Sequence, residues 1–86
     1  MENDIYENLR KVEIAISKNE AWFKNLWESN ADKYEFQDLA GIIYKSALGG
    51  KLPLDRFDKG WQYRTVLHED YEQAKTEFAN LILGWY

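Results

Sequence analysis

The feature that most constrains this chain is the recurrence of apolar residues every three or four positions near its C-terminus. The members of this stripe are separated by steps of four, three, four, three and four residues: Leu67, Tyr71, Ala74, Phe78, Leu81 and Trp85. This spacing matches the 3.6 residues per turn of an α-helix. Thr65 or Asp70 can begin the helix, and acids at 69, 70 and 72 suit its first turn. The pattern predicts a long amphipathic helix.

A similar stripe runs through the first third of the chain, with one missing position at Asn19. It consists of Ile5, Leu9, Val12, Ile16, Phe23 and Trp27, and is widened by Ile14, Ala15, Trp22 and Leu26. Asp4 can cap this helix, which we expect to run to about Glu28. Straight, it would span roughly 37 Å, which is long for a small domain. We therefore expect a kink or a break at SKNE, residues 17–20, because Ser and Asn compete for backbone hydrogen bonds.

A second helix is predicted from about Lys33 to Leu48. Ser29, Asn30 and Asp32 are typical of the turn or cap before it, and Gly49–Gly50 are typical of a helix end. Its apolar face is expected to consist of Phe36, Leu39, Ala40, Ile42, Ile43, Ala47 and Leu48.

The stretch GGKLPLDRFDKGWQYR, residues 49–64, allows two interpretations. Leu54, Phe57 and Trp61 have helical spacing, and Asp55 lies near a helix start after Pro53. Alternatively, DRF and WQYRTV are the strands of a β-hairpin over about 52–66, with a turn at DKG. We favour a short helix, because a lone two-stranded hairpin is marginally stable.

The chain of 86 residues is long enough for one domain, 1–86. We therefore predict an all-α helical bundle of three long helices and a short fourth, with an α+β fold carrying the hairpin as the alternative. Apolar residues make up 45% and aromatic residues 16%, which suits a small but well-filled core. The expected core is Leu9, Val12, Ile16, Phe23, Trp27, Phe36, Leu39, Ile43, Leu67, Phe78, Leu81 and Trp85.

The inventory of reactive side chains argues against an enzyme. There is one histidine, His68, and no cysteine, so a zinc set cannot be completed from these residue types. Adjacent Glu69 and Asp70 point in different directions on a helix, and no phosphate-loop or nucleophile motif occurs. We predict no catalytic residue, no metal and no cofactor. No apolar run is long enough for a membrane span, and the acidic N-terminus is unlike a secretory signal, so we expect a cytoplasmic protein.

Charge is unevenly placed along a chain whose net charge is −4. Acids dominate residues 1–7, 28–38 and 69–77, whereas residues 40–66 carry five bases and two acids. Aromatic residues and Arg are enriched in interface cores, and the stretch 56–64 holds both. Trp61 and Trp85 fall on helical stripes and are expected in the core. We predict partner contacts from four residues: Arg56, Tyr63, Arg64 and Tyr86.

These patterns favour a small non-enzymatic protein that binds a protein partner and modulates or inhibits it. In size, acidity and aromatic content the chain resembles the small helical inhibitors and immunity-type proteins of bacteria and phages. One alternative is an acidic mimic of nucleic acid that blocks a DNA- or RNA-binding enzyme. A second is a module that binds single-stranded nucleic acid through the basic, aromatic stretch 51–64, although the net charge disfavours nucleic-acid binding. The long first helix also suggests a homodimer, because it offers more apolar surface than one chain can cover.

Overall fold

The computed structural model describes residues 2–61 and 69–86, with side chains described from residue 5 onward. Over these residues the chain is all-helical. The helices are α1 (Glu2–Lys18), α2 (Glu20–Ser29), α3 (Lys33–Leu48), α4 (Leu54–Gly60) and α5 (Tyr71–Trp85). The all-α class predicted from the sequence is confirmed. The short helix favoured for this stretch is confirmed as α4, and the alternative hairpin is wrong for the described part of 52–66, because residues 54–60 are helical. The described residues form five helices and not the predicted four.

The expected long first helix is two helices that meet at Asn19. The Asn19 side-chain amide donates a hydrogen bond to the Ala15 carbonyl at 2.8 Å, and its backbone N–H donates to the Ile16 carbonyl at 3.0 Å. These local bonds end α1, as the competition of Asn with the helix ladder predicts. Helix α1 begins at Glu2, before the predicted cap at Asp4, and α2 ends at Ser29. Asn30 then takes a left-handed conformation with φ of 56°.

The other helix boundaries follow the local chemistry of the sequence. The Asp32 carboxylate accepts hydrogen bonds from the backbone N–H groups of Tyr34 and Glu35, both at 3.0 Å, and so caps α3. Gly49, with φ of 77°, ends the same helix at its predicted position. Asp70 caps α5 through the Glu72 N–H, which decides between the two proposed starts of this helix.

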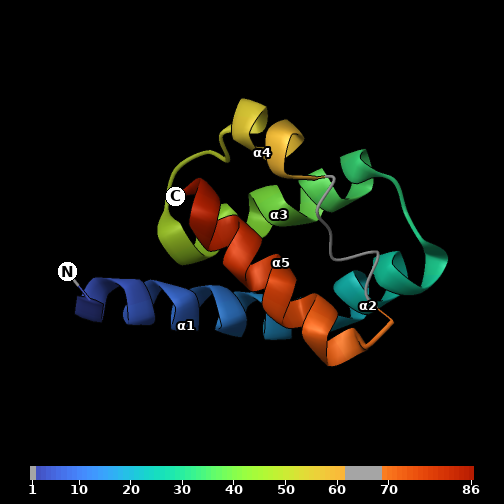
Figure 1. The fold of residues 1–86 in the computed structure, drawn as a ribbon, viewed down its shortest axis with the longest axis horizontal. Coiled ribbons are helices and arrows are strands. Elements are labelled where there is room, and N and C mark those ends of the chain that lie inside the picture. Colours follow the sequence, from blue (N-terminus) through green and yellow to red (C-terminus); the bar gives the residue numbers. More distant parts are fainter. Residues whose placement is uncertain (1, 62–68) are drawn as a thin grey trace.

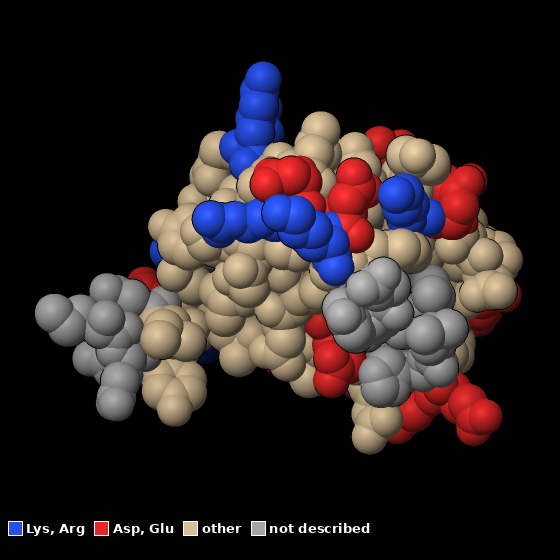
Figure 2. All heavy atoms as spheres, turned by 45° about the horizontal axis from the view of Figure 1, so that its top comes forward, with Lys and Arg blue, Asp and Glu red and all other residues tan. Residues whose placement is uncertain are grey.

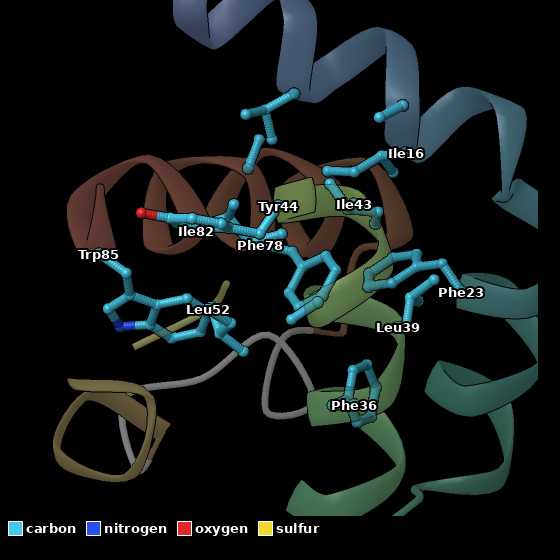
Figure 3. Close-up of a cluster of buried hydrophobic side chains, with 14 of the residues drawn as sticks. Ile16, Phe23, Phe36, Leu39, Ile43, Tyr44, Leu52, Phe78, Ile82 and Trp85 are labelled. Carbon is cyan, nitrogen blue, oxygen red and sulfur yellow. The ribbon is translucent and has the colours of Figure 1, made fainter. Parts of the chain in front are cut away.

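Helix α1 packs against α3 and α5, while α2 continues the chain against α3 (Figure 1). Helix α4 packs on α5, on the side of the molecule away from α1. The core lies between α1, α3 and α5. At its centre Phe78 stacks on Phe23, with ring centroids 5.1 Å apart, and meets Phe36 at 5.9 Å (Figure 3).

Most of the predicted core is confirmed, with corrections at its edges. Leu9, Trp27 and Leu81 are only partly buried, and Leu67 lies outside the described residues. Ile5, Ile14 and Ile42, which were assigned to apolar stripes, are 57%, 47% and 48% exposed. Ile5 lies in the first turns of α1, which project beyond the other helices (Figure 1). The buried positions absent from the predicted core include Leu26, Tyr44, Leu52, Phe57 and Ile82.

Candidate partner-binding surface

The predicted contact region lies where α4 meets the C-terminal half of α5. Gly60, the last residue of α4, permits a close approach, because a Cβ atom there would lie 3.1 Å from Trp85 Nε1 and 3.2 Å from a Leu81 methyl group. Beside this contact is a shallow hollow of about 390 Å³. It is lined by Arg56, Lys59, Gly60, Asn80, Leu81, Gly84 and Trp85. We call this region the α4–α5 hollow.

Arg56 joins the two helices at one end of the hollow. Its Nη1 donates a hydrogen bond to the Trp85 carbonyl at 3.3 Å, at the C-terminal end of α5. A cation is favourable at this position, because the last carbonyls of a helix carry partial negative charge. A guanidinium has five N–H donors, and the exposed Arg56 side chain keeps others for a partner. Arg56 therefore holds α4 in place in addition to its predicted role as a contact.

Lys59 presents its charge at the same wall of the hollow, whereas Asp58 of the same helix is turned toward α3. The Asp58 carboxylate lies 3.1 Å from Lys33 Nζ, and the hydrogen bond and charge of Asp58 raise the pKa of Lys33. Lys59 forms no ion pair with any described residue. The wall facing α5 is thus basic, although blue and red side chains are interleaved over the wider face (Figure 2).

Tyr86 lies directly after Trp85 at this end of α5. Its side chain is 60% exposed, and its ring centroid lies 6.2 Å from that of the buried Tyr44. The structure therefore brings Arg56 and Tyr86, two of the four predicted contact residues, to the same end of α5. Tyr63 and Arg64 lie outside the described residues.

Trp61 and Trp85 are used in packing. The Trp61 ring stacks on Phe57 at 5.5 Å and contacts Phe36 at 5.1 Å, and the Trp85 ring lies 4.8 Å from Phe57. Trp85 is buried and Trp61 is partly buried, as their positions on helical stripes predicted. The Trp61 ring thus contributes to packing between α3 and α4 through its contacts with Phe36 and Phe57.

Lys59, Leu81 and Gly84 also line the hollow and were not among the predicted contacts. One signal was present in the sequence, because Gly60 follows a helical pattern, in which glycine costs stability relative to alanine unless packing requires it. Without the packing of α4 on α5, however, the sequence does not show which side chains border the contact.

A polar cluster joins α2 to α5 elsewhere in the molecule. Glu20 Oε1 accepts hydrogen bonds from Lys75 Nζ at 2.9 Å and from the Tyr71 hydroxyl at 3.3 Å. The hydrogen bond and charge of Lys75 lower the pKa of Glu20. Burial and the adjacent Glu20 carboxylate raise the pKa of Tyr71 to about 12. This cluster links two helices and includes no nucleophile beside a general base.

The described residues offer no group of three His, Cys, Asp or Glu side chains that could hold a metal ion. His68 lies outside them. Within residues 2–61 and 69–86, no helix has the length and apolar character needed to cross a bilayer.

Comparison of the chain with known protein families, with curated protein sequences and with solved structures finds no match in any of the three.

Proposed function

We propose that this chain is a non-enzymatic binding protein that modulates or inhibits a protein partner, and that the α4–α5 hollow is its contact surface. The observation that carries this proposal is the combination of an apolar floor, formed by Leu81, Gly84 and Trp85, with a wall bearing Arg56 and Lys59. Protein interfaces commonly combine apolar contact area with Arg and Tyr at their centre. A partner segment would fit this surface if it placed an apolar side chain in the hollow and a carboxylate beside Arg56 or Lys59.

The interleaved charges of this face favour a protein over a nucleic acid. Binding to a phosphate backbone draws its affinity from clustered cations that release counterions. Here Asp55 and Asp58 lie on the same short helix as Arg56 and Lys59. A face of this kind suits a protein surface with its own mixture of charges better than a polyanion.

A capture experiment tests the proposal. The tagged protein is used to capture partners from a bacterial lysate, and the capture is repeated with the double variant Lys59→Glu, Tyr86→Ala. Lys59 lines the hollow and Tyr86 directly follows the lining residue Trp85. Both side chains are exposed and neither is part of the core, so the fold should be kept. We expect the variant to lose a specific prey, with affinity for the purified partner at least about tenfold weaker.

The matched control makes the same two chemical changes away from the hollow, as Lys24→Glu, Tyr34→Ala. Both of these side chains are exposed, on α2 and α3. The control variant should retain the prey. Identical prey sets from all three proteins would refute the assignment of the hollow.

The nucleic-acid mimic is a second candidate, and one observation favours it. Glu72 and Glu77 border an open hollow on α5 together with Gln73 and Thr76, and Glu69 and Asp70 are exposed just before it. If the chain acts as a mimic, an oligonucleotide should compete with it for the captured partner, and Glu72→Gln, Glu77→Gln should weaken binding. If the α4–α5 hollow is the contact, neither should occur.

A further inference from the structure

A second groove lies between α1 and α3, away from the α4–α5 hollow. It has a volume of about 420 Å³ and is lined by Lys11, Ile14, Ala15, Lys18, Ser46 and Ala47. Successive helical residues turn by about 100°, so Ile14 and Lys18 lie nearly opposite Ile16, which faces the core. Ile14 and Lys18 therefore face away from the core, whereas Ala15 beside them is buried.

Two large apolar side chains are exposed on these helices: Ile14, which lines the groove, and Ile42, which lies beyond its lining on α3. Ile14 on α1 is 47% exposed, and Ile42 on α3 is 48% exposed. Ile42 lies one helical turn before Ser46 and shares its side of α3. The lining residues Ala15, Ser46 and Ala47 are small, so a third helix can approach the two helix backbones closely.

Two lysines of α1 give the groove positive charge. Lys11 and Lys18 are exposed and seven residues apart on α1, which is two helical turns or about 10 Å along the axis. Lys18 forms no ion pair with any described residue, and Lys11 approaches the exposed Glu7 at only 4.0 Å. Ion pairs between exposed side chains contribute little to stability, so the ammonium groups of Lys11 and Lys18 are both available to carboxylates of a partner.

We propose that this groove binds an acidic amphipathic helix of a partner protein. The apolar stripe of the docked helix lies between Ile14 and Ile42, as helices lie in grooves generally. Carboxylates seven residues apart on one face of that helix match the spacing of Lys11 and Lys18. This inference does not depend on the role of the α4–α5 hollow, because the two surfaces share no lining residue.

The test uses a fluorescein-labelled synthetic peptide of about 18 residues, or five helical turns. Leu occupies its i, i+3, i+4 and i+7 positions and Glu flanks the apolar stripe. A second peptide has Lys at every Glu position. Fluorescence anisotropy at low salt should show the Glu peptide binding at least tenfold more tightly than the Lys peptide. Lys18→Glu should weaken the Glu peptide about tenfold and strengthen the Lys peptide.

Lys59→Glu makes the same change on α4 and should leave both affinities unchanged. Ile14→Asp should abolish binding while far-ultraviolet circular dichroism stays helical. Absence of binding by the Glu peptide, or equal binding to wild type and Lys18→Glu, overturns the proposal. A concentration-dependent dimer in analytical ultracentrifugation that Ile14→Asp abolishes would instead assign the groove to a second copy of the chain, and would also overturn it.

Discussion

Two aspartates, Asp32 and Asp70, lie at the starts of helices α3 and α5. Each carboxylate accepts backbone N–H groups that have no partner within the helix itself. Asp32 accepts two such bonds and Asp70 accepts one. These aspartates show at the scale of single residues why helices begin where they do.

The first prediction concerns Asp32. Asp32→Ala leaves the N–H groups of Tyr34 and Glu35 without their acceptor, so the free energy of unfolding should fall by about 1 kcal/mol. Urea denaturation followed by circular dichroism measures this change. The control Asp38→Ala alters an exposed Asp further along α3 and should change stability by less than about 0.5 kcal/mol. Equal losses in both variants would contradict the capping role.

The second prediction concerns the pH dependence that Glu20 confers. Lys75 lowers the pKa of Glu20 in the folded state, so the unfolded chain binds a proton at this position more readily than the folded chain. The contribution of Glu20 is therefore present above about pH 4.5, the ordinary value, and is lost as pH falls through the lowered pKa. The Glu20→Gln variant has no carboxyl group to protonate at this position, so its free energy of unfolding should fall less as the pH is lowered.

Thermal unfolding between neutral and acidic pH provides the measurement. The wild type should lose more stability than Glu20→Gln over the acidic range, whereas the control Glu77→Gln should follow the wild type. Glu77 is exposed on α5, and no hydrogen bond or ion pair joins its side chain to another described residue. Parallel curves for all three proteins would show that the Glu20–Lys75 contact does not form in solution.

At the scale of elements, the packing of α4 on α5 depends on Gly60, which has no Cβ atom. The third prediction compares Gly60→Ala with Gly41→Ala. An added Cβ at Gly60 meets Trp85 and Leu81, which should cost about 1–3 kcal/mol, whereas nothing lies within 4 Å of the same atom at Gly41. Gly41→Ala should instead stabilise α3 by up to about 1 kcal/mol. Chemical denaturation of both variants should give changes of opposite sign.

Most of the elements were predictable from the sequence because their signals are local. The Asp32 cap, the Gly49 stop and the competition of Asn19 with the helix ladder each act within a few residues of themselves. The exposure of Ile14 and Ile42 was not predictable, because it depends on which sides of α1 and α3 face each other. Phe57 is fully buried for a similar reason, since it meets Trp85 from a distant part of the chain.

The candidate surface was predictable only in part. Arg56 was identified because Arg is enriched in interface cores. Tyr86 was identified because it is an aromatic residue that lies off the apolar stripe of the last helix. Their proximity depends on α4 packing at the end of α5, which is a tertiary contact without a local signal. The hydrogen bond from Arg56 to the Trp85 carbonyl, which gives Arg56 a structural role, depends on the same contact.

At the scale of the whole molecule, one aromatic cluster links α2, α3 and α5. The fourth prediction is that Phe78→Ala costs about 3–5 kcal/mol, because Phe78 is fully buried against Phe23 and Phe36. Domains of this size have a total stability of roughly 4–13 kcal/mol, so a large share would be lost. Circular dichroism during thermal unfolding measures the effect. Tyr34→Ala removes an exposed ring and should change stability little; an equally large loss there would contradict the account.

The break at Asn19 also limits the length of the molecule. An unbroken helix over residues 2–29 would be about 42 Å long, whereas the longest dimension of the molecule is 36 Å. Part of its apolar face would then extend beyond the rest of the protein and would be exposed to water. Exposed apolar surface of this kind favours association between molecules, so we expect the break at Asn19 to lower the tendency of the chain to aggregate.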